Sequence, residues 1–108
     1  MVNSRAKGAA GERELSKFLR EHGYSARRSQ QYCGAAGDED ITHTVPDIYI
    51  ECKRVQNLNL DKALEQAVKD SEGTGKVPTI WHRKNGKEWK VTLYATDFLK
   101  LVEKLSDV

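Results

Sequence analysis

The stretch Ile48–Lys53 is the part of the sequence that most restricts the fold. It reads Ile-Tyr-Ile-Glu-Cys-Lys and follows the turn-forming Val45-Pro46-Asp47, so its β-branched and aromatic residues predict a strand. Alternation would divide this strand between two faces: Ile48, Ile50 and Cys52 on one, and Tyr49, Glu51 and Lys53 on the other. We therefore expect one face in the core. The other face carries a carboxylate and an ammonium group, a pair that is common on exposed strands and also suited to catalysis.

Periodic patterns on both sides of this strand predict an α/β domain with a mixed sheet. Apolar residues at helical spacing indicate helices, and β-rich runs indicate further strands. The expected helices cover about residues 8–22, about 60–71, and a C-terminal segment through Phe98, Leu101, Val102 and Leu105; the other expected strands cover 24–29, 40–43, 77–83 and 88–94. Turn residues predict two hairpins, 40–43 with 48–53 and 77–83 with 88–94 around Asn85-Gly86. The resulting order is αβββαββα in a single domain, residues 1–108.

Length and composition exclude several classes of protein. The 108 residues suit one globular domain. No run approaches the ~18 apolar residues of a membrane helix, and the first residues lack the apolar segment of a signal peptide, so we expect a cytoplasmic protein without a membrane partner. Cys33 and Cys52 are too few for a disulfide framework and have no zinc-site spacing, so both are expected as thiols.

The net charge of +2 conceals an uneven distribution. Residues 1–36 hold seven Lys/Arg and three Asp/Glu, residues 37–72 hold four and nine, and residues 73–108 hold seven and four. An acidic middle between basic ends suits a surface that binds a polyanion together with a divalent cation. Chance explains uneven charge equally well, so this interpretation needs support from particular residues.

Glu12 is a carboxylate on the apolar side of the first expected helix. At 100° per residue it lies within about 60° of Leu15 and Leu19. Because an unpaired buried charge costs several kcal/mol, Glu12 is expected to be paired, bound to a metal or neutralised. Alternatively, it lies near a frayed helix N-terminus, where the helix dipole or an arginine would satisfy it.

The acidic cluster around residue 40 offers a partner for Glu51. Asp47 lies four residues from Glu51 on one strand, so their Cα atoms would be roughly 13 Å apart, too far to share an ion bound at about 2.1 Å. We interpret Asp47 as a turn residue. Asp40 begins the preceding strand, and the intervening turn would bring it beside Glu51, forming a Mg²⁺ site with Lys53 next to it. If the register is shifted, Asp38 takes the place of Asp40.

These residues resemble the PD-(D/E)xK nuclease superfamily. The resemblance is carried by Glu12 on a helix, Asp40 on a strand, the triplet Glu51-Cys52-Lys53 and the αβββαβ order. Several stretches resemble the Holliday junction resolvase-like endonucleases of phages and prophages: Gly11–Leu15, Ala26–Tyr32, Ile50–Arg54, Leu64–Ala67 with Asp70, and Val77–Trp89. The resemblance covers nearly the whole chain. It implies a restriction-endonuclease-like core, with a central mixed β-sheet flanked by helices.

The resemblance implies a Mg²⁺-dependent DNA endonuclease that hydrolyses phosphodiester bonds and leaves a 5′ phosphate, with Mn²⁺ able to substitute for Mg²⁺. Asp40, Glu51 and the Cys52 carbonyl would bind the metal. Lys53 would orient the attacking water or stabilise the developing charge, and Glu12 would hold a second ion or a metal-bound water. Gln66, on the following helix, would assist the site. No small-molecule cofactor is implied.

The partners implied are DNA, branched or duplex, and a second copy of the chain, because the family cuts two strands symmetrically. Arg27, Arg28 and Ser29 match the region that contacts the scissile phosphate, and Arg54, Arg83 and Lys84 are further candidates for DNA contact. Basic hairpin tips also occur simply for solubility. If the chain is encoded by a phage, it would act in the cytoplasm of the bacterial host.

Two other functions fit the same residues. The first is a nuclease without junction selectivity, acting on duplex, nicked or flap DNA. The second is a non-catalytic DNA-binding module with a structural acidic cluster, which would bind DNA without Mg²⁺ and leave it uncut.

Overall fold

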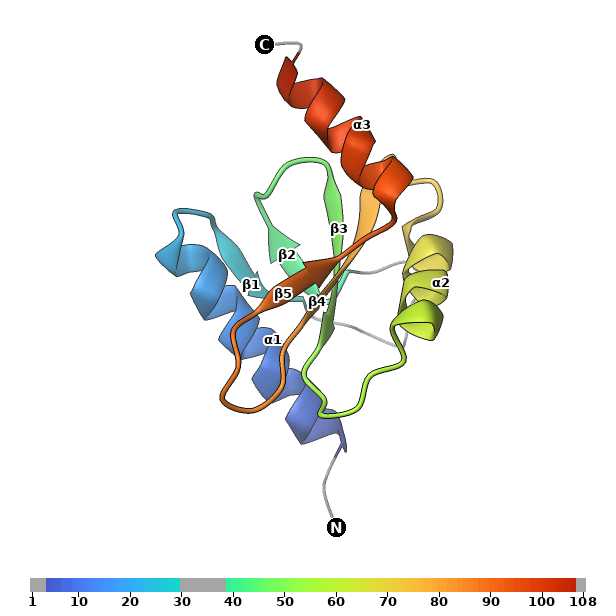
Figure 1. Cartoon of the computed structure of the whole chain (residues 1–108). Coiled ribbons are helices and arrows are strands. Elements are labelled where there is room, and N and C mark those ends of the chain that lie inside the picture. Colours follow the sequence, from blue (N-terminus) through green and yellow to red (C-terminus); the bar gives the residue numbers. More distant parts are fainter. Residues whose placement is uncertain (1–3, 30–38, 107–108) are drawn as a thin grey trace.

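The computed structural model describes residues 4–29 and 39–106 (Figure 1). The elements follow one another as α1 (Ser4–Glu21), β1 (Ala26–Arg28), β2 (Ile41–His43), β3 (Ile48–Lys53), α2 (Leu60–Ser71), β4 (Val77–His82), β5 (Lys90–Thr92) and α3 (Ala95–Ser106). This order and the α/β class are those that the sequence predicts. Cys33 and Asp38, the alternative to Asp40, lie outside the described residues.

The strands of the described part form two sheets. β3, β4 and β5 make a mixed sheet, and β1 pairs with β2 in a small antiparallel sheet. β3 and β4 are parallel, with α2 in the connection between them, and β4 and β5 are antiparallel. The predicted hairpin of β4 with β5 is therefore confirmed. The predicted hairpin of 40–43 with 48–53 is wrong, because β2 pairs with β1 instead of β3.

Instead of the expected main-chain hydrogen bonds between β2 and β3, main-chain N–H groups of β3 bond to side-chain carboxylates. The N–H of Ile50 donates to the Glu39 carboxylate over 2.9 Å, and the N–H of Cys52 donates to Oδ2 of Asp40 over 2.8 Å. β3 is an edge strand of its sheet, and buried main-chain donors need an acceptor. Two carboxylates supply that acceptor, so the segment before β2 is held against β3 without a strand pairing.

Helices cover both faces of β3 (Figure 1). On the α1 side, one buried cluster contains Leu15, Leu19, Ala26, Ile41, Ile48 and Ile50. On the α2 side, a second buried cluster contains Ala63, Leu64, Ala67 and Ile80. Tyr49 is also buried, so the first half of β3 is enclosed on both faces, as expected for a parallel strand between helices. Only its second half, where Glu51 and Lys53 lie, is partly open.

α3 extends from the end of β5 away from the sheets (Figure 1). None of its residues is buried, and Phe98, Leu99, Val102 and Leu105 are 52%, 57%, 38% and 75% exposed. Leu101 packs against the α1-side cluster and anchors the helix there. No described helix, α3 included, is long and apolar enough to cross a membrane.

A glycine allows α1 to approach the end of β3. A Cβ atom at Gly11 would lie 2.5 Å from Cβ of Arg54, the residue that follows β3, whereas a Cβ at Gly8 would meet nothing within 4 Å. Real Cβ atoms do not come so close, because their repulsion at this distance is severe. The helix therefore lies nearer to β3 than any other residue at position 11 would permit.

We expect Gly11→Ala to lower the free energy of unfolding by about 1–3 kcal/mol, as overpacking does. Gly8→Ala is the matched control and should raise the same free energy by about 0.5–1 kcal/mol, because alanine is the better helix former. Urea unfolding followed by far-UV circular dichroism measures both changes. Similar stabilisation by the two substitutions would contradict the close packing at Gly11.

Candidate active site

Glu51 and Lys53 form a charged pair on the partly open half of β3. Nζ of Lys53 lies 3.7 Å from Oε1 of Glu51, whose side chain is 12% exposed. Burial, followed by the negative charge of Asp40, raises the pKa of Glu51 to about 7, although Lys53 partly offsets both effects. The carboxylate form of Glu51 is therefore costly here. An additional positive charge would stabilise it.

Asp40 lies beside Glu51, as expected from the sequence, but a different interaction places it there. Its carboxylate is held by the Cys52 N–H instead of being delivered by a hairpin. Its charge raises the pKa of Glu51 and also that of Glu12. Asp40 therefore repels both Glu51 and Glu12, and such repulsion between carboxylates favours the binding of a cation.

Glu12 faces this region from the middle of α1. Its side chain is 13% exposed, and Nε of Arg28 donates to its Oε2 over 3.4 Å. Burial and then the charge of Asp40 raise the pKa of Glu12, while Arg28 opposes the shift. Glu12 is thus a paired carboxylate, and its partner is an arginine, as in the alternative given above. A frayed helix end does not explain it, because α1 begins two turns earlier, at Ser4.

Cys52 lies between Glu51 and Lys53 with its thiol directed to the α1-side cluster. Burial raises the pKa of this thiol well above its ordinary value, and the charges of Asp40 and Glu12 add to the effect. The side chain is therefore a protonated core residue, and its possible contribution to the site is the main-chain carbonyl.

Gln66 points from the exposed side of α2 to a neighbour on the same helix. Its Nε2 donates to Oδ1 of Asp70 over 3.0 Å. The charge of Asp70 contributes to the raised pKa values of Glu51 and Tyr49. Asp70 therefore bonds Gln66 and also lies close enough to Glu51 to affect its pKa. The sequence shows the i, i+4 spacing of this pair but not its orientation toward β3.

Asp47 lies at the opposite end of β3, in the turn that precedes it. Its φ of 65° is in the left-handed region, which Asp tolerates better than most residues, and its carboxylate lies 3.0 Å from Nζ of Lys104. The interpretation of Asp47 as a turn residue is confirmed.

The basic residues expected to contact DNA fall into two groups. Arg27 is exposed on β1, and Ser29, just after it, bonds to Thr42 through the two hydroxyl groups (2.9 Å). Arg54 and Arg83 instead converge on Glu14, with N···O distances of 3.1 and 2.8 Å. Glu14 therefore ties α1 to the segments after β3 and β4. The sequence does not indicate this role, because helical periodicity places Glu14 on the solvent side of the helix.

Glu39 is, after Glu14, a second carboxylate whose role the sequence does not indicate. Besides the Ile50 N–H, it accepts a hydrogen bond from Nε2 of His43 over 2.6 Å and forms an ion pair with Lys76. Burial alone would raise its pKa, but these hydrogen bonds together lower it below the ordinary value. Glu39 is therefore a structural anion that joins the start of β2 to β3 and to the segment before β4.

The donor set at this end of β3 suits a magnesium ion. Among the described residues, no three His, Cys, Asp or Glu side chains are grouped to form a complete metal site by themselves. Mg²⁺ does not need such a cage, because it is usually bound by one or two carboxylates and completed by water and substrate oxygens. Asp40, Glu51 and a main-chain carbonyl are hard oxygen donors of this kind, and the mutual repulsion of the carboxylates favours a cation.

The fold and these residues can be compared with known proteins. Residues 3–108 match the model of the family described as "Phage putative PDDEXK endonuclease". The chain belongs to this family. The match spans nearly the full length, and it agrees with the resemblance inferred from Glu12, Asp40 and the Glu51-Cys52-Lys53 triplet. Membership makes the chain a PD-(D/E)xK endonuclease of phage type, a hydrolase of phosphodiester bonds.

A solved structure shares the fold of this phage-type endonuclease. It is Hjc of Archaeoglobus fulgidus, described as a Holliday junction resolvase from an archaeal hyperthermophile, with a TM-score of 0.59 and 23% sequence identity. The similarity covers 78% of this chain and 74% of that chain. At this identity the likeness concerns the fold, which is therefore resolvase-like. No curated protein sequence matches the chain.

Glu39→Gln should lower the free energy of unfolding at pH 7 by about 2 kcal/mol, since hydrogen bonds to charged groups contribute about 1.5–3 kcal/mol. The pKa of Glu39 is lowered by folding, so its contribution is complete above the ordinary carboxyl pKa of 4.5 and is lost as the pH falls through the folded value. The difference between wild type and variant should therefore shrink below about pH 4.5.

Thermal unfolding in EDTA at several pH values measures this difference. Glu103→Gln is the control, because Glu103 is exposed on α3 and has no ion pair within the described part of the chain. A difference that stays constant down to pH values where every carboxyl is protonated would show that the charge of Glu39 is not the cause.

Proposed function

We propose that this PD-(D/E)xK protein is a Mg²⁺-dependent endodeoxyribonuclease selective for branched DNA, of the Holliday junction resolvase type. The observation that carries the proposal is the repulsion of Asp40 with both Glu12 and Glu51, beside the ammonium group of Lys53. This arrangement stores negative charge that a divalent cation would neutralise. It also leaves a positive group next to the place where a phosphate would bind.

In this proposal each residue near the end of β3 has a distinct task. Asp40, Glu51 and the Cys52 carbonyl hold the cation, for which Mn²⁺ can substitute. When bound, the cation activates water and stabilises charge on the phosphoryl oxygens. Lys53 orients the attacking water or stabilises the developing charge, and Glu12 holds a second ion or positions a water.

Two flanking groups support this centre. Gln66, held by Asp70, assists from α2. Arg27, Arg28 and Ser29 contact the scissile phosphate from β1, and the hydrolysis leaves a 5′ phosphate. Arg28 already bonds Glu12, so it lies within reach of both the carboxylate cluster and a phosphate placed beside it.

The proposal is tested by incubating the protein with a labelled four-way junction and a matched linear duplex in Mg²⁺, Mn²⁺ or EDTA. We expect the junction to be cut faster, and cutting to need metal. Glu51→Gln and Asp40→Asn should each slow cutting by about two orders of magnitude, because each removes a charge that binds the cation. Asp47→Asn is the control, since Asp47 lies at the other end of β3 and Asn tolerates its positive φ.

Three results would change the assignment. Equal cutting of junction and duplex would remove the branched-DNA selectivity and leave a general endonuclease. Metal-independent DNA binding without any cutting would indicate a binding module. Loss of cutting in Asp47→Asn, at unchanged thermal stability, would move the metal site away from Asp40.

The same proposal includes a homodimer, which would let two active sites cut two strands symmetrically. The exposed apolar face of α3, formed by Phe98, Val102 and Leu105, supports a contact between two copies. The charged residues of α3, two acidic and two basic, cancel, so two copies of the helix can approach without net repulsion. In a monomer this apolar face would be exposed to water, which costs free energy, and association of two copies would bury it.

We expect Phe98→Lys/Leu105→Lys to shift the protein from dimer to monomer, because each copy would bring two positive charges to the contact. Thr96→Lys/Ser106→Lys adds the same charge to α3 at polar positions and is the control, which should stay dimeric. Sedimentation velocity at the concentrations used for cleavage measures the state. A monomeric wild type under those conditions would contradict the dimer.

A further inference from the structure

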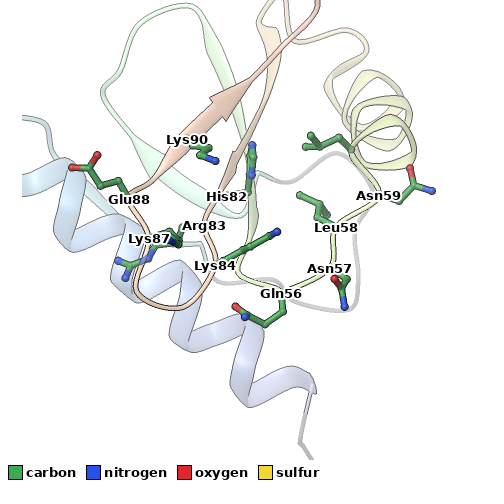
Figure 2. Close-up of a pocket in the computed structure, with 11 residues that line it drawn as sticks. Gln56, Asn57, Leu58, Asn59, His82, Arg83, Lys84, Lys87, Glu88 and Lys90 are labelled. Carbon is green, nitrogen blue, oxygen red and sulfur yellow. The ribbon is translucent and has the colours of Figure 1, made fainter.

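A groove lies between the two loops that follow β3 and β4 (Figure 2). It has a volume of about 910 Å³ and is lined by residues 56–60 on one side and by residues from 82–90 on the other. This is near the upper end of the 300–1,000 Å³ typical of ligand-binding clefts. The residues of the catalytic proposal do not line this groove, which therefore requires its own interpretation.

The groove begins next to the candidate active site. Lys53 and His82 are direct partners in the register of the parallel pair β3 and β4, and His82 lines the groove. Its walls are the loops at the carboxyl ends of these two strands, the position where ligands of open α/β sheets usually bind. A chain bound in the groove would therefore pass directly from the carboxylate cluster onto this surface.

One wall of the groove is basic. Lys84, Lys87 and Lys90 line it, and none of them has an ion pair within the part of the chain that the structure describes. In Figure 2 the side chain of Lys84 extends toward the 56–58 segment, whereas the carboxylate of Glu88 points away from it. Arg83 differs from the lysines, because Glu14 holds it. This wall thus presents uncompensated ammonium groups to a bound anion.

The opposite wall carries side-chain amides and leucines. Leu58 and Leu60 pack against the α2-side cluster and form an apolar surface between the amides. The side-chain Oε1 of Gln56 accepts a hydrogen bond from the main-chain N–H of Asn85 over 2.7 Å, and this bond joins the two walls at one end. The exposed Asn57, by contrast, has no hydrogen bond to another described residue, so its amide can serve a ligand.

We propose that this groove holds an unpaired DNA strand next to the cleaved phosphate, with its phosphates on the lysine wall and its bases on the amide and leucine wall. The inference rests on the proposed function, and it specifies the substrate as DNA that has a single-stranded segment beside the cut. Lysines bind phosphates as point charges, and amide side chains hydrogen-bond to base edges.

The division of chemistry between the walls favours one strand over a duplex. In a duplex the bases face the complementary strand and the two backbones lie outside, so a groove that held a duplex would meet phosphates on both walls. Here only one wall is basic. A single strand instead presents its backbone on one side and its bases on the other, and proteins bind it with a basic groove next to a surface for the bases.

The test measures binding of a fluorescein-labelled oligothymidylate and of a duplex of equal length by anisotropy, in EDTA so that nothing is cut. We expect the single strand to bind more tightly. Lys84→Gln/Lys87→Gln should weaken its binding about tenfold and reduce the slope of log affinity against log salt by about 1.4, the value for two phosphate contacts with a single strand. Lys17→Gln/Lys100→Gln removes the same charge elsewhere and should change neither quantity.

A further variant separates base contacts from phosphate contacts. Asn57→Ala should weaken binding of the single strand without changing the salt slope, because an amide that contacts a base releases no counterion. Wild-type affinity and slope in the lysine variant, or equal losses in the Lys17 and Lys100 control, would overturn the proposal. So would a duplex that binds as tightly as the single strand and loses as much in the lysine variant.

The same proteins distinguish this inference from the proposed function. If the wild type cuts no DNA in Mg²⁺ or Mn²⁺ while groove-dependent binding of the single strand persists, the nuclease proposal fails and the groove assignment holds. If the wild type cuts junctions and the lysine variant binds the single strand normally, the groove assignment fails by itself.

Discussion

The arrangement of the site depends on two hydrogen bonds from main-chain N–H groups of β3 to side-chain carboxylates. Ile50 donates to Glu39 and Cys52 donates to Asp40, so two adjacent acidic residues occupy the edge of a strand that would otherwise need a partner strand. One of them, Glu39, forms an ion pair with Lys76 and a hydrogen bond with His43. The other, Asp40, remains close to Glu51 and Glu12, whose pKa values are raised first by burial and then by its charge. The same two hydrogen bonds thus cover the edge of β3 and bring negative charge close to it.

Most of the helices and strands could be predicted from the sequence, because each depends on a local pattern of apolar residues. The bounds of β3 and the end of α2 agree with the alternating and helical patterns at Ile48–Lys53 and Leu60–Ser71. Strand pairing is different, since a turn such as Val45-Pro46-Asp47 shows that the chain reverses but not which edges meet. β2 therefore pairs with β1, although the sequence favours a hairpin with β3. The side-chain bonds that replace this hairpin leave no periodic signal.

The candidate site was predictable to the same extent and for the same reason. Glu12 could be identified because a carboxylate on an apolar helix stripe violates the local pattern, and the structure gives it Arg28 as partner. Glu14 obeys the pattern, so nothing in the sequence indicates that it binds Arg54 and Arg83, which are 40 and 69 positions away along the chain. Contacts of this range depend on the assembled tertiary structure. Only complementary charge, which many other pairs share, could have suggested them.

The missing side chain at Gly11 has a consequence for the reach of Glu12. The two residues are neighbours on α1, and the helix backbone rests directly on Arg54 at Gly11. One methyl group there would move the helix outward by an amount comparable with a carbon–carbon bond, and a displacement of about 1 Å can cost a catalytic centre about 100-fold in rate. The distance between α1 and β3 is thus set by the absence of a side chain at Gly11. Because position 11 carries only a hydrogen atom, Glu12 on α1 comes closer to Glu51 on β3 than a larger residue there would allow.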